Sequence, residues 1–432
     1  MKCQLSISIL VSNHIDTVRK CLESVKPLLD RLRAELIVVD TGSTDGSIDV
    51  AKEYTDKIIP FVWCNDFSAA RNVGLKAAHG EWFLYLDDDE WFEDVSEIIN
   101  FFETEKYMDY GRAFYVQRNY EDYEGTRYTD AHVLRMFQIV EGTHFKFRIH
   151  ELVSPELDPL KVFSTYVHHY GYIGKSEEKH QRNATLLRKE LKDNPNEMRM
   201  FAQLVNEYCV VKNYGAVIDL KEALDRIERG SVNDALYCYV HAKIAECYFH
   251  LDRIQDAITY TRWLFEQKLC NTITEAHLYI VLINAYAKPE AEDNECEMLL
   301  YCFEKYMNRI KKQPIDEVTF SKTALLGMGK VFRDDYMEEV IHFMINATYG
   351  KAAYNKLVEI LREYHISIRE ETEQENVAVA KEMEEMKKKL LVMIQTLVDD
   401  GQIEAAYQAV NQAIAIMGED EELMAVRQIF IE

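Results

Sequence analysis

The amino-acid sequence predicts two parts: an α/β domain with an open, mostly parallel sheet over residues 1–175, and an all-α domain of helical repeats over residues 176–432. In the first part, short β-branched and aromatic runs alternate with stretches of helical periodicity, which is typical of successive βα units. In the second part the strand pattern stops and long helical stretches follow. Only seven of the 16 glycines and three of the seven prolines lie there, which favours long helices with few breaks.

The expected elements of the first part alternate between strand and helix. The first strand covers Leu5 to Val11, and the next helix begins near Asp16, with Pro27 closing it or starting another turn. A continuous apolar run that ends in Asp40 suits a central strand buried on both faces. The remaining elements are expected as a helix over 47–54, a strand over 58–62, a helix over 68–79 and a strand over 82–86.

Charge and composition limit the classes of partner. With 50 Lys and Arg against 74 Asp and Glu, the net charge is −24, which repels phosphate backbones and anionic lipid headgroups. We therefore expect no nucleic-acid partner. No stretch reaches the ~18 consecutive apolar residues that span a bilayer, so no integral membrane segment is expected and the chain is predicted to be cytoplasmic. The nine cysteines are scattered without CxxC pairs, which argues against disulfides and a structural zinc site.

Polar side chains follow three of the predicted strands directly. Asn13 follows the first strand, Asp40 ends the second, and Asp87 to Asp89 follow the fourth. Ligands of open α/β sheets bind beyond the carboxyl ends of the strands, so these residues are candidates for one site. Carboxylates this close repel one another unless a cation offsets them. Mg²⁺ or Mn²⁺ suits such oxygen ligands and takes further ligands from a nucleotide diphosphate; a solvated acidic loop is the alternative.

Several motifs, in this order, resemble those of family 2 glycosyltransferases, which have the GT-A fold. The matching stretches are ISILVSNHIDTVRKCLESV, ELIVVDTGSTDGS, DFSAARNVGLKAAHGEWFLYLDDDE, LRMFQ and FRIHEL, which begin at residues 7, 35, 66, 134 and 147. They span roughly 40% of the chain, and a chance match to several motifs in register is rare. The resemblance implies a Rossmann-like sheet and transfer of a hexose from a UDP-sugar, with inversion of the anomeric carbon and with Mg²⁺ or Mn²⁺ as cofactor.

The resemblance assigns the nucleotide pocket to the ends of the first strands. It implies that the backbone at Val11, together with Ser12 and Asn13, contacts the base and the ribose, although the family usually has Tyr or Lys in place of Ser12. Asp40 matches the carboxylate that recognises the base. Arg71 matches a residue that supports the nucleotide and its diphosphate; holding the acidic loop is its alternative role.

The resemblance also divides the roles of the acidic cluster. Asp87 would contact the ribose or a metal-bound water, and Asp89 would ligate the metal. Asp88 fills a position often taken by alanine, so it would be a solvated neighbour at the edge of the nucleotide-sugar site. His169, in the sequence HHYGY, is implied as a further metal ligand. A satisfied histidine without a ligand is the alternative.

Glu151, in FRIHEL, is the candidate general base that removes the proton of the acceptor. The competing interpretation makes His150 and Glu151 a structural hydrogen-bonded pair. Arg135, in LRMFQ, would lie near the acceptor or the diphosphate, or pair with Glu151.

The second part resembles tetratricopeptide repeats, in which a glycine turns the chain between two helices. Ala245, Tyr248, Asp252 and Ala257 fall near the spacing of such a helix-turn-helix unit; a generic helical solenoid or bundle is the alternative. Stacked helical repeats expose an extended concave surface that suits a peptide. GT-A domains fused to such repeats resemble bacterial enzymes that glycosylate peptides or proteins, so the predicted acceptor is a peptide or protein side chain. The helices could equally mediate a homodimer.

Two other functions compete with this one. The same chemistry could act on a lipid-linked or cell-surface saccharide. Alternatively, the chain could be a helical interaction scaffold whose sheet domain binds a nucleotide without turnover. The intact DxD and HE sequences favour an enzyme, whereas no local signature identifies the sugar.

Overall fold

The computed structural model describes residues 2–171, 177–227, 234–287, 293–312, 328–366, 386–398, 402–417 and 421–430. The chain divides into two compact units, and the described residues up to Thr274 belong to the first unit, while those from Glu275 onward belong to the second. The predicted boundary at residue 175 lies outside the described residues.

An eight-stranded sheet forms the core of the first unit, with its strands in the order β3-β2-β1-β4-β7-β6-β10-β5. Four of the seven strand pairs are parallel, which confirms the predicted α/β class with a mostly parallel sheet. The strands are β1 (Leu5–Val11), β2 (Ala34–Asp40), β3 (Ile58–Pro60), β4 (Trp82–Asp87), β5 (Glu90–Phe92), β6 (Arg112–Tyr120), β7 (Tyr128–Gln138) and β10 (Leu160–His169). A small second sheet consists of β8 (His144–Lys146) and β9 (Leu152–Ser154).

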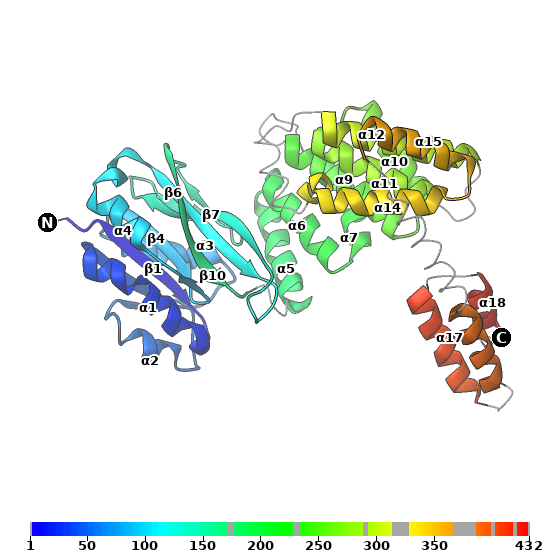
Figure 1. The fold of residues 1–432 in the computed structure, drawn as a ribbon. Helices are drawn as coiled ribbons and strands as arrows, with labels where there is room; N and C mark the ends of the chain where they lie inside the picture. Colours follow the sequence, from blue (N-terminus) through cyan, green and yellow to red (C-terminus); the bar gives the residue numbers. More distant parts are fainter. Residues whose placement is uncertain are drawn as a thin grey trace. The chain divides into compact units, whose positions relative to one another are not determined.

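Helices cover both faces of the parallel half of the sheet, as Figure 1 shows. All residues of β1 are buried, because alternate side chains enter opposite cores. Leu5, Ile7 and Ile9 join one core and Leu10 joins the other. The helices of the first core are α1 (Ile15–Arg31), α2 (Ser47–Ala51) and α4 (Ser96–Glu103), and that of the second is α3 (Phe67–Lys76). A short 3₁₀ helix, η1, covers Lys106–Asp109.

Of the two roles predicted for Pro27, closing the first helix is wrong, because α1 continues to Arg31. A proline in a helix interior removes one backbone hydrogen bond and costs ~3 kcal/mol or more. Val25 and Leu28 on either side of Pro27 are fully buried against the sheet, so their packing offsets that cost. Tertiary packing therefore overrides the local signal.

The sheet domain is followed, in the same unit, by helices that pack against one another. They are α5 (Glu177–Asp193), α6 (Met198–Val210), α7 (Tyr214–Asp219), α8 (Lys221–Leu224), α9 (Asp234–His250) and α10 (Ile254–Glu266). The predicted helix-turn-helix around Asp252 is confirmed as α9 and α10. No glycine makes this turn, because Asp252 itself adopts the left-handed conformation with φ of 57° and the N–H of Arg253 donates to the carbonyl of Tyr248.

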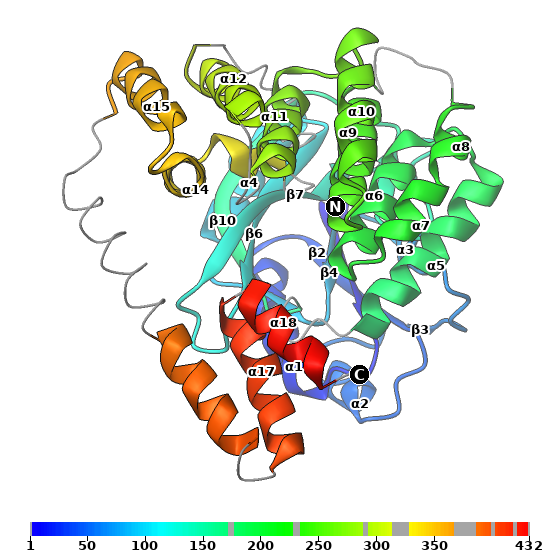
Figure 2. The ribbon, with the colours of Figure 1, turned by 90° about the vertical axis from the view of Figure 1, so that its right-hand side faces the viewer.

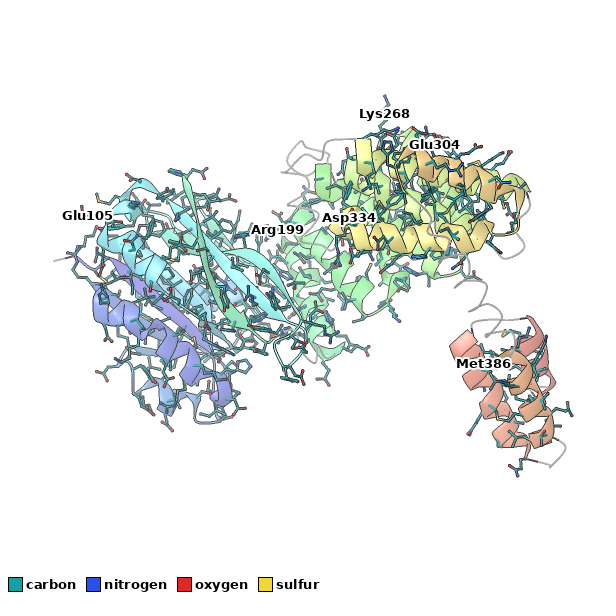
Figure 3. The ribbon with its side chains drawn as sticks, in the orientation of Figure 1. Glu105, Arg199, Lys268, Glu304, Asp334 and Met386 are labelled. Carbon is teal, nitrogen blue, oxygen red and sulfur yellow. The ribbon has the colours of Figure 1, made fainter. Side chains whose placement is uncertain are left out.

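The second unit is also helical in its described part. Its elements are most of α11 (Thr272–Tyr286), α12 (Asp293–Lys312), η2 (Met328–Phe332), α14 (Asp334–Thr348), α15 (Ala352–Glu363), a helix over 386–398, α17 (Ile403–Met417) and α18 (Glu421–Ile429). The last three helices share the small core of Ile394, Ala406 and Val410, and Figure 2 shows α17 beside α18. Figure 3 marks Glu304 on α12 and Asp334 at the first residue of α14. None of the described helices is long and apolar enough to cross a membrane.

Candidate active site

The sheet brings together the three strand ends that the sequence singled out. In the parallel register Val11 lies beside Asp40, and Leu10 lies beside Asp87. The polar residues after β1, β2 and β4 therefore meet at one edge, where open α/β sheets bind their ligands.

Two predicted nucleotide residues organise the loops at this edge. Asn13 has a left-handed backbone with φ of 53°, and its Oδ1 accepts a hydrogen bond of 2.7 Å from the N–H of Thr44. The Oδ1 of Asp40 accepts from the N–H groups of Gly42 and Ser43, at 3.0 and 2.8 Å. The two side chains thus fix the loops that follow β1 and β2.

The carbonyl of Val11 accepts hydrogen bonds of 3.0 Å from both the N–H and the Oγ1 of Thr41. This contact ties the end of β1 to the start of the loop after β2. Of the three predicted residues from 11 to 13, Val11 is buried, whereas Ser12 and Asn13 are exposed.

Asp88 is buried, with 3% of its surface exposed, so the expectation of a solvated neighbour is wrong. Its Oδ2 accepts from the N–H of Ser12 at 2.7 Å, and its Oδ1 lies 2.5 Å from Nδ1 of His14. The hydrogen bond to Asp88 raises the pKa of His14 to about 9, so His14 is a cation at neutral pH. Asp88 therefore holds the loop after β1 against the end of β4.

A buried guanidinium joins the acidic strand end to the candidate base. Nη2 of Arg71 donates to Oδ1 of Asp87 and Nε donates to Oε1 of Glu151, both at 2.7 Å. Arg71 is 6% exposed and lies on α3. Its guanidinium therefore links α3 to the end of β4 and to the segment before β9. This contact with Asp87 favours the alternative role considered above, in which Arg71 holds the acidic loop.

A second arginine reinforces the first from β7. Nη2 of Arg135 donates to Oε1 of Glu90 at 2.7 Å and to Oδ2 of Asp87 at 3.3 Å. Burial alone would raise the pKa of Asp87, but Arg71 and Arg135 outweigh it and hold that pKa well below its usual range. Arg135 thus pairs with Asp87 and Glu90, while Glu151 pairs with Arg71.

Asp89 and His169, the two predicted metal ligands, face each other. Oδ2 of Asp89 lies 3.8 Å from Nε2 of His169. Two donors that share one divalent ion lie about 3 to 4 Å apart, because each is about 2.1 Å from the ion. Nδ1 of His169 lies 2.7 Å from Oδ1 of Asn119, an amide oxygen that accepts its proton, so Nε2 is the ring nitrogen that would bind a metal.

The space beside this pair is kept open by Gly171. A Cβ added to Gly171 would lie 2.5 Å from Nε2 of His169 and 3.0 Å from Oδ2 of Asp89. Burial and the charges of Asp87 and Asp88 raise the pKa of Asp89 to about 6, which reflects the cost of a further negative charge without a cation. The donors therefore fit Mg²⁺ or Mn²⁺.

The described residues contain no group of three or more His, Cys, Asp and Glu side chains arranged to hold a metal. A site with two protein donors is nevertheless typical of Mg²⁺, which takes its remaining ligands from water and from substrate phosphates.

The structure adds residues that the sequence analysis missed. Glu90 is fully buried and also accepts a hydrogen bond from Gln117. His168, the neighbour of His169 in the sequence, has other partners than Asp89. His168 hydrogen-bonds Glu93 and Tyr120 and belongs to an aromatic stack with Trp91. The position of Glu90 directly after Asp89 in the acidic run could have signalled it, whereas nothing local signals the partners of His14 and His169.

Comparison with known proteins shows what the sequence of this chain is similar to. Residues 6–157 match the protein-family model described as Glycosyl transferase family 2. A TPR repeat-containing protein of Synechococcus elongatus is 30% identical over 215 residues, which cover 46% of this chain and 51% of that protein. The SPbeta prophage-derived glycosyltransferase SunS of Bacillus subtilis is 26% identical over 268 residues, which cover 58% of this chain and 59% of SunS.

A shorter match is to the Escherichia coli UDP-Glc:alpha-D-GlcNAc-diphosphoundecaprenol beta-1,3-glucosyltransferase WfaP, which is 30% identical over 121 residues, or 27% of this chain and 48% of WfaP. The chain thus spans 51% and 59% of the lengths of the first two relatives. The match over residues 6–157 takes in β1 to β4, the acidic cluster and Glu151. The N-terminal region of this chain is a family 2 glycosyltransferase domain.

Proposed function

We propose that this protein is a metal-dependent, inverting glycosyltransferase that moves a hexose from a UDP-sugar to a peptide or protein side chain. The observation that carries the proposal is the pair formed by Asp89 and His169, 3.8 Å apart at the strand ends beside the opening at Gly171. A family 2 domain over residues 6–157 supports the same chemistry.

In the proposed reaction, Glu151 is the general base. Its Oε1 accepts a hydrogen bond from Nε of Arg71, and within the described ranges no hydrogen bond to its Oε2 is found. Oε2 would accept the proton of the acceptor group as that group attacks the anomeric carbon and UDP departs. When bound, the divalent ion would offset the negative charge that develops on the departing diphosphate.

Arg71 would orient Glu151, because it contacts both that carboxylate and Asp87. Asp40, Asn13 and Ser12, at the ends of β1 and β2, would bind the uridine. The name of the relative WfaP includes UDP-Glc as its donor, which supports a uridine nucleotide here.

The acceptor class is supported by the helical part. A TPR repeat-containing protein is among the relatives, and α9 and α10 form a helix-turn-helix of the predicted kind. Stacked helical pairs suit an extended peptide better than a single sugar. A lipid-linked saccharide is the second candidate acceptor, because the name of WfaP gives a diphosphoundecaprenol-linked sugar as its acceptor.

Hydrolysis of UDP-sugars tests the donor half of the proposal without knowledge of the acceptor. We expect release of UDP from UDP-glucose or UDP-N-acetylglucosamine that requires Mn²⁺ or Mg²⁺ and is lost in Asp89→Asn. Asp30→Asn, on the exposed face of α1, is the control and keeps full activity. Turnover without metal, or unchanged turnover in Asp89→Asn, would remove the proposed metal role.

A further inference from the structure

The segment that carries the candidate base is held from two sides. The carbonyl of Arg148 accepts a 2.9 Å hydrogen bond from the N–H of Phe67, at the first residue of α3. On the other side, the N–H of Arg148 donates to Oε2 of Glu190 on α5, also at 2.9 Å. The segment 147–151 therefore lies between the sheet domain and the first helices that follow it.

The backbone conformation of residues 147–151 depends on the contacts around it. Phe147 and His150 both adopt left-handed conformations, with φ of 75° and 54°. Such conformations are costly for residues other than glycine and persist where the surroundings impose them.

Glu190 is the main contact of α5 with this segment. It is 3% exposed, and besides the N–H of Arg148 its Oε2 accepts from Nη1 of Arg148 at 3.1 Å. Asn194 donates to its Oε1 at 2.6 Å, so both carboxylate oxygens are engaged. The guanidinium of Arg148 also reaches Asp193, at 2.6 Å, but the Asp193 side chain is 55% exposed.

Glu207 on α6 makes a second contact, next to the base itself. It is 5% exposed, and its Oε1 lies 3.9 Å from Nε2 of His150. His180 and Asn183, both on α5, donate to the carboxylate of Glu207 at 2.6 and 3.0 Å. Hydrogen bonds thus join α5 to Glu207 on α6, and the buried Nε2 of His150 lies near the same carboxylate at a distance longer than a hydrogen bond.

We infer that α5 and α6 position the general base: Glu190 fixes the backbone at Arg148 and Glu207 lies against the side chain of His150, so that Glu151 meets Arg71 and the acceptor in the correct place. This inference rests on the proposed function of Glu151. It makes the start of the helical part a component of the transferase site, in addition to any role in acceptor binding. Glu190 and Glu207 are positioning residues, because they act through Arg148 and His150.

The first test measures the backbone, independently of turnover. In hydrogen exchange of the full chain, the amides of residues 147–151 should exchange about tenfold faster in Glu190→Gln than in the wild type. Asp193→Asn is the matched control, because it removes a contact to the same guanidinium but leaves the backbone hydrogen bond. Equal exchange in Glu190→Gln and Asp193→Asn would overturn the inference.

The second test separates positioning from general destabilisation. In Mn²⁺-dependent hydrolysis of UDP-glucose or UDP-N-acetylglucosamine, kcat should fall about ten- to a hundredfold in Glu190→Gln and Glu207→Gln. The KM for the donor should stay within twofold of the wild-type value, because the nucleotide contacts lie at β1 and β2. Asp193→Asn should keep both values.

The outcomes distinguish the two proposals. Wild-type kcat in both Gln variants, in an otherwise active protein that Glu151→Gln inactivates, would overturn the positioning role and leave the proposed function intact. A proportionate change in kcat and in the KM for the donor in Glu190→Gln and Glu207→Gln would also overturn the positioning role. A wild-type protein that hydrolyses neither nucleotide sugar would overturn the proposed function and, with it, the catalytic role of the two helices.

Discussion

Arg71 and Glu151, 80 positions apart in the sequence, form a buried ion pair in which Nε lies 2.7 Å from Oε1. The same guanidinium binds Asp87 at the end of β4. One side chain of α3 thus ties the acidic strand end to the loop that carries the candidate base, and the geometry of the site depends on it.

Replacing Arg71 with methionine should therefore destabilise the fold. Asp87 and Glu151 would lose a buried partner, and a broken buried ion pair costs about 3 kcal/mol or more in unfolding free energy. Urea denaturation measures this loss. Arg19→Met, which removes an exposed pair with Glu53, is the control and should cost less than about 1 kcal/mol. Equal losses of unfolding free energy in the two variants would show that the ion pairs of Arg71 do not stabilise the fold.

Gly171→Ala should weaken metal binding while the fold is kept. The added methyl would lie 2.5 Å from Nε2 of His169, between this nitrogen and Asp89. We expect the affinity for Mn²⁺, measured by calorimetry in the presence of UDP, to fall at least about tenfold. Gly215→Ala is the matched control, since an added Cβ there meets no atom within 4 Å. Unchanged affinity in Gly171→Ala would place the metal elsewhere.

Glu151→Gln should abolish turnover without loss of donor binding. The amide keeps an oxygen for Arg71 but cannot accept the acceptor proton at neutral pH, so kcat should fall about a hundredfold or more. The dissociation constant for UDP with Mn²⁺ should stay within twofold. A variant that retains the wild-type kcat would exclude Glu151 as the base.

Stability at acid pH should depend on Glu35. Burial would raise the pKa of Glu35, but hydrogen bonds from Lys57, Ser6 and the N–H of His79 outweigh it and lower the pKa to about 2, from an ordinary 4.5. Because the pKa is lower in the folded state, the stabilisation is present above pH 4.5 and is lost as the pH falls toward 2.

Glu35→Gln should therefore reduce the dependence of unfolding free energy on pH in that window by about 1 to 2 kcal/mol, after allowance for solvent screening. Urea titrations at pH 5 and pH 3 measure the difference. Glu53→Gln, at an exposed ion pair, is the comparison. A wild-type slope in Glu35→Gln would contradict the assigned pKa.

The parallel half of the sheet could be predicted because its signals are local. Leu36–Val39 is a continuous apolar run, and the structure ends β2 at Asp40, directly after it. The antiparallel half was not predicted, because in β6 the apolar run Ala113–Val116 is followed by Gln117, Arg118 and Asn119, and the burial of Gln117 and Asn119 has no local signal. The position of β6 in the sheet is set by pairing with β7 and β10.

In the candidate site, too, some features have a local signal in the sequence and others depend on contacts between distant residues. The strand-end position of Asp87 to Asp89 can be read from sequence, and it brings these residues to the edge of the sheet. The contact between Arg148 and Glu190 joins residues 42 positions apart in two different elements, and no local pattern encodes it. Likewise, the burial of Asp88 depends on a partner, His14, that lies beyond another strand.

The position of bound Mn²⁺ tests the central claim most directly. A crystal of the full chain with Mn²⁺ and UDP should show anomalous scattering from one ion between Oδ2 of Asp89 and Nε2 of His169, in contact with the diphosphate. That peak should be absent from crystals of Asp89→Asn. An ion bound away from both side chains, or UDP bound at this edge with no ion between them, would contradict the account.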